Sequence, residues 1–200
     1  MIKYPTGSVP KVVNKATAVK KPRGLLSANR GMNLEEDINI SNQYYIDKDI
    51  AVITKRPTPI NIVKVDYTRG ARITDAYFEK QSTTDYNGVY RSRYLDFEAK
   101  STKLRTSFPL SNITKHQIIH LKNVIKHGGI AFFIIRFETL NETFLLDASF
   151  VIEAFGGENR KSIPYQDVKK SGHLIKNGFI PRLFYLEIVD SVYFWFFVLK

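Results

Sequence analysis

The chain has 200 residues, no cysteine, and 30 lysines and arginines against 19 acidic residues, for a net charge of +11. Its length suits one domain with a real core, and the lack of cysteine excludes disulfide frameworks, cysteine-ligated zinc and thiol nucleophiles. No stretch approaches the roughly 20 apolar residues that span a bilayer, and the N-terminus lacks the apolar segment of a secretory signal. We therefore expect a cytoplasmic protein without membrane contact.

The basic excess is concentrated at the N-terminus. Residues 1–30 carry seven lysines and arginines and no acid, so they supply +7 of the +11 and leave +4 for the rest. Proline and glycine are frequent there, and we predict a disordered basic arm over 1–28, followed by one folded domain over 29–200. Such an arm suits a polyanion. The alternative is a merely solvated tail, and the arm alone does not distinguish DNA, RNA or membrane as its partner.

The folded domain is predicted to begin with a helix. Asn33 can cap it, Glu36 stands three residues later as in a capping box, and the helix should end near Ile46. Two strands are expected next, over 50–54 and 60–65, separated by prolines.

Residues 66–82 interleave basic and aromatic side chains with little regular periodicity. Such a segment suits contact with phosphates and unstacked bases. A half-buried hairpin with a solvated charged face is an equally good interpretation. On the first interpretation, DNA contacts are assigned to Arg69, Arg72, Tyr77, Phe78 and Lys80.

The clearest predicted helix covers 112–127 and ends at Gly128-Gly129. The apolar run 130–135 that follows is typical of a central strand covered on both faces. Its hairpin partner is expected at 143–146. Strands and helices that alternate in this way indicate an α/β fold, with a mixed sheet flanked by helices.

The C-terminal part is less regular. We expect a short helix at 149–155 and then a polar, lysine-rich segment over 156–178, mostly loop with a short helix. An aromatic cluster at 193–197 would pack most simply on the core or on a partner subunit.

The predicted strand 94–100 carries charge on one face only. Side chains of a strand alternate between its faces, so Asp96, Glu98 and Lys100 lie on the same face and three apolar residues on the other. The apolar face marks the side of the core.

Two turns compete for the hairpin that ends in this strand. A turn at Arg91-Ser92 pairs Asp85 with Glu98 and brings their Cβ atoms to about 5 Å, where both carboxylates could hold one divalent cation. The pair Asn87-Gly88 is the stronger hairpin signal in general, but it separates Asp85 from Glu98. We favour the later turn, with Gly88 as a bulge, because the earlier turn leaves strand 94–100 unused.

Two carboxylates and a lysine in this arrangement suit magnesium-dependent hydrolysis of a phosphodiester. Magnesium prefers oxygen ligands, and a neighbouring lysine can orient a water or stabilise the transition state. The alternative is an ion pair between Glu98 and Lys100 on a solvated sheet surface, and the short motif alone would favour it. Asp85 at hairpin distance and the basic character of the chain favour a DNA endonuclease with Asp85, Glu98 and Lys100 as catalytic residues.

Three further polar features have simple structural alternatives. His116 and His120 have a spacing that zinc could use, but no third ligand is evident. Asp96 suits a structural ion pair with an arginine at least as well as a catalytic role. Glu36 suits helix capping better than metal binding.

The spacing of Asp85, twelve residues and then Glu98-x-Lys100 resembles the PD-(D/E)xK nuclease superfamily, although Thr84 stands where proline would precede the aspartate. Longer words resemble the RecU family of Holliday-junction resolvases from about residue 29 to 190, and the aromatic tail after Val192 has no match. The matching words are residues 29–32, 34–37, 55–60, 82–90, 96–100, 106–110 and 116–117.

This resemblance implies a restriction-endonuclease-like core with a protruding stalk insertion at about 66–82. It also implies magnesium ligands at Thr83, Asp85, Glu98 and Gln117, with Lys100 stabilising the transition state. The residue pattern alone would leave Gln117 in solvent.

The resemblance further implies a homodimer that cuts two strands of a four-way DNA junction symmetrically during homologous recombination and repair, with the stalk entering the junction. Recombinase and branch-migration proteins are implied as partners. Arg30 and Lys103 are added to the residues expected to contact DNA. The rival hypotheses are a non-catalytic nucleic-acid binding module on a nuclease fold and a nuclease that cuts linear duplex.

Overall fold

The computed structural model describes residues 33–78 and 83–194. The chain divides into two units, Met1–Gly31 and Met32–Lys200, and all elements below belong to the second. The predicted arm over 1–28 lies outside the described residues, as do Arg30, Lys80 and the last part of the aromatic cluster.

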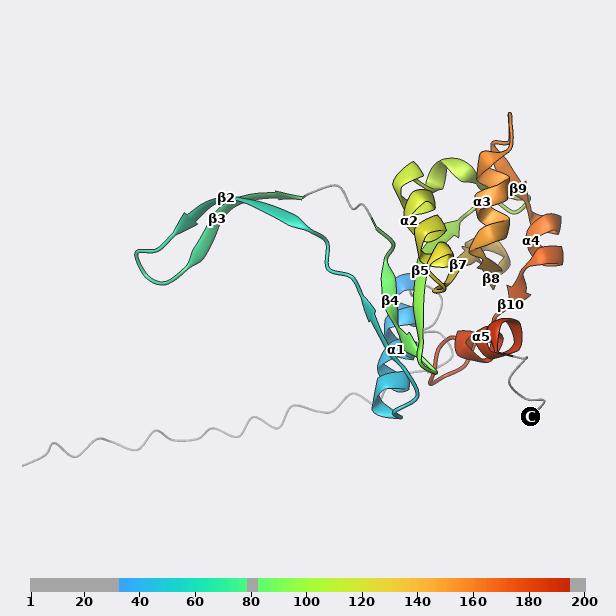
Figure 1. Ribbon diagram of the computed structural model, residues 1–200, viewed down its shortest axis with the longest axis horizontal. Helices are drawn as coiled ribbons and strands as arrows, with labels where there is room; N and C mark the ends of the chain where they lie inside the picture. Colours follow the sequence, from blue (N-terminus) through green and yellow to red (C-terminus); the bar gives the residue numbers. More distant parts are fainter. Residues whose placement is uncertain (1–32, 79–82, 195–200) are drawn as a thin grey trace, which may run out of the picture. The chain divides into compact units, whose positions relative to one another are not determined.

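The core is a six-stranded mixed sheet in the order β1-β4-β5-β7-β8-β10 (Figure 1). Its central strands β5 and β7 pair in parallel, and every other neighbouring pair is antiparallel. The strands are β1 (Val52–Lys55), β4 (Tyr86–Tyr90), β5 (Arg93–Thr102), β7 (Ile130–Phe137), β8 (Glu142–Asp147) and β10 (His173–Leu174). A parallel pair needs a crossover connection, and here it contains helix α2.

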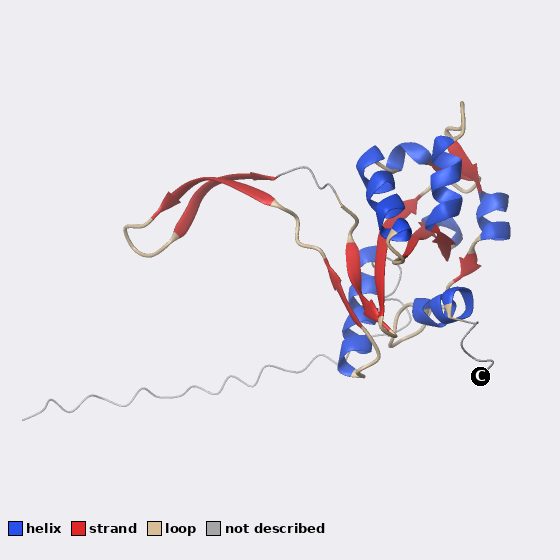
Figure 2. Ribbon diagram, viewed as in Figure 1, coloured by secondary structure: helices blue, strands red, loops and turns tan. Residues whose placement is uncertain are grey.

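Helices cover both faces of this sheet (Figure 2). Helices α1 (Leu34–Asp47) and α5 (Tyr185–Tyr193) pack their buried apolar residues against one face. The other face packs against α2 (Lys115–Lys126), α3 (Ala148–Gly156) and α4 (Tyr165–Ser171). The smaller elements are η1 (Leu110–Asn112), η2 (Glu138–Leu140) and the strand pair β6 (Ser107–Pro109) and β9 (Ser162–Pro164). The predicted fold class is confirmed.

Helix ends follow their caps. Asn33 caps α1 as predicted, although its side chain accepts from the amide of Glu35 and not from that of Glu36. The second predicted helix begins at Lys115 instead of 112, because Thr114 is its cap. The Thr114 hydroxyl and the Gln117 side chain form a reciprocal capping box.

The hairpin β4–β5 turns at Arg91 and Ser92, whose φ angles are 47° and 60°, so the favoured turn is confirmed. The predicted bulge at Gly88 is wrong, because the register runs through it without a shift. Gly88 is required by a neighbour instead: a Cβ there would lie 2.1 Å from the carbonyl oxygen of Val52 in β1.

Strands β2 (Ile60–Asp66) and β3 (Arg72–Phe78) form a separate two-stranded sheet. Residues 66–82 thus include only the second strand of a hairpin that starts at Ile60. Every residue of β3 is exposed, so this hairpin is more exposed than the half-buried alternative predicted from the sequence. Register shifts between Ile62 and Val65 fit the poor periodicity of the segment.

The described part of the aromatic C-terminus packs on the core. The Tyr193 hydroxyl donates to Asp147 Oδ2 at 2.7 Å, and Phe194 is buried against Tyr90. Within 33–78 and 83–194, no helix is long and apolar enough to cross a membrane.

Candidate active site

The site is built on the face of β5 that lies under α2. Glu98 pairs in register with Phe133 of β7, which belongs to the apolar core on the α2 side. Leu95, Phe97 and Ala99 point into the opposite core, as the alternation predicted. The Glu98 side chain is 0% exposed, so its ion pair with Lys100 is not on a solvated surface.

Three groups converge on the Glu98 carboxylate from three elements. Lys100 Nζ, on the same strand, lies 2.6 Å from Oε1. Gln117 Nε2 donates to Oε1 from α2 at 2.6 Å. The backbone amide of Asp85, just before β4, donates to Oε2 at 3.2 Å.

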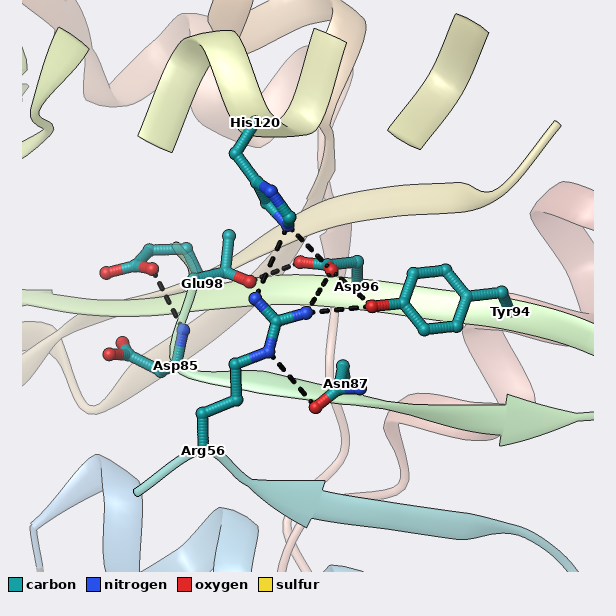
Figure 3. Close-up of polar contacts among 8 residues, drawn as sticks. Arg56, Asp85, Asn87, Tyr94, Asp96, Glu98 and His120 are labelled. Atoms are coloured by element: carbon teal, nitrogen blue, oxygen red, sulfur yellow. Dashed lines mark hydrogen bonds and ion pairs between the residues drawn. The ribbon is translucent and has the colours of Figure 1, made fainter. Parts of the chain in front are cut away.

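Asp85 faces Glu98 across the hairpin (Figure 3). Its Oδ2 accepts from the backbone amide of Ala99 at 3.3 Å, and its backbone carbonyl accepts from the amide of Arg56 at 2.7 Å. Burial, and then the Asp85 charge, raise the pKa of Glu98 to about 8, although Lys100 opposes this shift. The hairpin therefore holds two carboxylates close together, which is unfavourable when both are ionised. A cation bound between them would reduce this repulsion.

Gln117 is buried, at 5% exposure, where the residue pattern alone suggested solvent. Its capping-box role explains its place, since the Oε1 atom accepts from the Thr114 amide at 3.0 Å and the Nε2 atom is left for Glu98. Thr83 is half-buried, two residues before Asp85. The structure thus brings Asp85, Glu98, Lys100 and Gln117 into one cluster.

The residues predicted to contact DNA lie elsewhere. Within the described residues they are exposed: Arg69 between β2 and β3, three side chains on β3, and Lys103 just after β5. The three on β3 are Arg72, Tyr77 and Phe78.

Around Asp96 the structure shows a network that the sequence did not predict as a unit. The ion pair with an arginine, one of the two alternatives predicted for Asp96, is present, because Arg56 Nη2 lies 2.7 Å from Asp96 Oδ2. His120 of α2 lies 2.9 Å from the same oxygen. No local signal could have identified these partners, since they are 40 and 24 residues away in the sequence.

In the described part of the chain, no group of three or more histidine, aspartate and glutamate side chains is arranged to hold a metal. An ion beside Glu98 would therefore rest on two carboxylates, with neutral oxygens and waters as its other ligands. Magnesium accepts such a set, because it typically binds one or two carboxylates and keeps several waters.

The family model described as RecU, recombination protein U, matches residues 29–191. The chain belongs to this family.

Relatives match over nearly the whole chain. The Holliday junction resolvase RecU of Geobacillus kaustophilus is 52% identical over 198 residues, which is 96% of this chain and 98% of that protein. The protein of the same description from Bacillus cereus is 47% identical over 200 residues, with the same coverage. A solved structure of the Holliday junction resolvase Hjc of Archaeoglobus fulgidus covers 68% of this chain and 94% of its own, with a TM-score of 0.41 and 10% identity, too low to transfer a function.

Proposed function

We propose that the chain is a magnesium-dependent endonuclease that resolves four-way DNA junctions by cutting two strands symmetrically. The observation that carries this is the meeting of Asp85 and Glu98 beside Lys100 in a buried site. Its support is membership of the RecU family, whose relatives are described as Holliday junction resolvases.

Asp85 and Glu98 would hold the magnesium ion, with Thr83 and Gln117 as the neutral ligands that the family resemblance implies. A bound magnesium ion supplies an acidified water and neutralises charge on the phosphate. Burial and the Asp85 charge raise the pKa of Glu98 to about 8 in the ion-free site. A cation held by the two carboxylates would favour the ionised form of Glu98 and so lower this pKa.

Lys100 would act as the transition-state stabiliser. Its ammonium group is held 2.6 Å from Glu98 Oε1, and its side chain is 22% exposed. With a cation bound to Glu98, the Lys100 ammonium would be available to a phosphate oxygen that gains charge during cleavage.

Gln117 would also help to orient the Glu98 carboxylate. In the structure its Nε2 faces Glu98 while its Oε1 is engaged with the Thr114 amide. Direct ligation by Oε1 would require the amide to turn and release that bond. Before such a turn, the hydrogen bond from Gln117 Nε2 would hold the Glu98 carboxylate in place.

Symmetric cleavage requires two such sites, so we include a homodimer in the proposal. The exposed β2–β3 hairpin would act as a stalk in the centre of the junction, with Arg69, Arg72, Tyr77 and Phe78 in contact with phosphates and unstacked bases. Recombinase and branch-migration proteins are proposed as partners on the same family basis.

A mobile four-way junction with magnesium tests this function. Wild type should cut two opposing strands, while Asp85→Ala and Lys100→Ala should lose about two to three orders of magnitude in single-turnover rate and still bind the junction. Binding without cutting by wild type would identify a non-catalytic binding module. Equal cutting of plain duplex and junction would contradict the proposed selectivity for four-way junctions.

A further inference from the structure

Asp96 lies on the same face of β5 as Glu98 but belongs to a different network. Its side chain is 0% exposed, yet four side chains donate to its carboxylate or pair with it. They come from the segment after β1, the segment before β4, β5 itself and α2. They are Arg56, Thr84, Tyr94 and His120.

The contacts divide between the two carboxylate oxygens. Oδ1 accepts from the Thr84 hydroxyl. Oδ2 is hydrogen-bonded to three groups, which are Arg56 Nη2 at 2.7 Å, the Tyr94 hydroxyl at 2.8 Å and His120 Nε2 at 2.9 Å. Figure 3 shows the Arg56 guanidinium between Asn87, Tyr94, Asp96 and His120.

A buried carboxylate costs several kcal/mol unless it is paired and fully hydrogen-bonded. This one is satisfied at both oxygens, so its partners are held in one arrangement. Removal of any partner should therefore change the position of the segment that supplies it.

Two of these partners lead directly to Asp85. Thr84 is its immediate neighbour, and Arg56 donates its backbone amide to the Asp85 carbonyl at 2.7 Å. Asp85 itself precedes the first residue of β4, Tyr86. The Asp85 backbone is thus held by two residues, Thr84 and Arg56, whose side chains both bind Asp96.

We propose that Asp96 is a positioning residue, which holds Asp85 against Glu98 through Thr84 and Arg56 and so sets the carboxylate pair for a divalent cation. This inference rests on the proposed function for its biological meaning. In this role Asp96 acts through Thr84 and Arg56 and not on a substrate phosphate, so it is not a catalytic residue.

The sharpest variant is Thr84→Val, because it removes the hydroxyl that reaches Asp96 and leaves the side-chain shape nearly unchanged. Thr84→Ser restores the hydroxyl and is the matched rescue. Asp96→Asn is a second variant, which keeps an acceptor for Thr84 and loses the charge that pairs with Arg56. Tyr165→Phe is the control, since it also removes a hydroxyl bonded to a carboxylate, that of Glu142 at 2.5 Å, outside this network.

The measurement is Mn²⁺ binding by the full chain without DNA, followed by electron paramagnetic resonance, with thermal unfolding of each variant in parallel. Thr84→Val and Asp96→Asn should weaken Mn²⁺ affinity about tenfold, the usual effect of losing a partner behind a metal ligand. Thr84→Ser and Tyr165→Phe should stay within about twofold of wild type. Junction cleavage should follow the Mn²⁺ affinity and recover partly at high metal concentration.

Two outcomes would overturn the inference. One is Mn²⁺ affinity of folded Thr84→Val and Asp96→Asn that equals wild type. The other is a loss in Thr84→Ser as large as in Thr84→Val, because the hydroxyl would then not be the cause. Wild-type cleavage of junctions tests the proposed function separately, since the Mn²⁺ comparison among variants does not depend on it.

Discussion

Glu98 occupies a position in the fold that opposes ionisation of its carboxyl group. It is buried beside a second carboxylate, and its only cationic neighbour among the described residues in contact with it is Lys100. Burial and Asp85 raise the pKa of Glu98 from its ordinary value of 4.5 to about 8. The unfolded chain therefore loses this proton at lower pH than the folded chain, and ionisation of Glu98 costs stability as pH rises between these values.

Glu98→Gln should remove this cost. In metal-free protein, the free energy of unfolding of the variant should gain on wild type as pH rises from about 5 to about 8, by on the order of 3 kcal/mol. Denaturant unfolding at several pH values in the presence of a chelator measures the difference.

Magnesium provides the matched condition for that experiment. It should stabilise wild type, because a ligand that binds only the folded state raises its stability, and it should stabilise Glu98→Gln much less. A stability difference that does not change between pH 5 and pH 8 would contradict the raised pKa.

At the scale of elements, the β4–β5 hairpin depends on the close approach of β1. Gly88→Ala would place a Cβ 2.1 Å from the Val52 carbonyl oxygen and 2.6 Å from Ile53 Cα, both backbone atoms. Since backbone cannot move aside cheaply, we expect a loss of about 3 kcal/mol or more in the free energy of unfolding.

The control is Gly156→Ala, at the end of α3, where an added Cβ meets nothing within 4 Å. Alanine there should change stability by less than about 1 kcal/mol. Chemical denaturation of both variants tests the pair. Equal stability would show that β1 is not held at this distance from β4.

The β2–β3 hairpin is a second element with its own expectation. Tyr77 and Phe78 are 59% and 78% exposed, so their loss should hardly affect folding. If they stack on unpaired bases, the double variant Tyr77→Ala/Phe78→Ala should lose about 1–3 kcal/mol of junction affinity per base that it no longer stacks.

Plain duplex is the comparison substrate for this variant, since its bases stay stacked and paired. Affinity for duplex should change much less than affinity for the junction in a fluorescence titration. An equal loss on both substrates would indicate general DNA binding by the hairpin and not recognition of the junction centre.

At the scale of the whole molecule, charge is divided unequally between the N-terminal segment and the rest. The segment 1–30 supplies +7 of the net +11. Triple neutralisation in the full chain, Lys20→Gln/Lys21→Gln/Arg23→Gln, should lower the slope of log affinity against log salt by about 0.9 for each DNA phosphate that the variant no longer neutralises.

Lys169→Gln/Lys170→Gln on α4 is the control for charge as such, because both lysines are exposed. Its salt slope should match wild type if the N-terminal segment is the part that contacts phosphates. Junction binding at several salt concentrations gives both slopes. Identical slopes for the triple variant and wild type would mean that the arm is only solvated.

The sequence by itself determined which side chains share a face of strand 94–100, and it favoured the turn that pairs the two carboxylates. The alternation of side chains along a strand placed Glu98 and Lys100 on one face. Counting residues from the turn at Arg91-Ser92 paired Asp85 with Glu98. These are local features, because the distance along a strand and across a hairpin follows from backbone geometry alone.

Only the tertiary structure decided what surrounds that pair. Gln117 enters from a helix that the chain reaches after η1, and Arg56 and His120 meet Asp96 from separate elements. The requirement for glycine at position 88 likewise becomes evident only when β1 is placed beside it. Contacts between distant segments depend on how whole elements pack, and no local pattern of side chains encodes that packing.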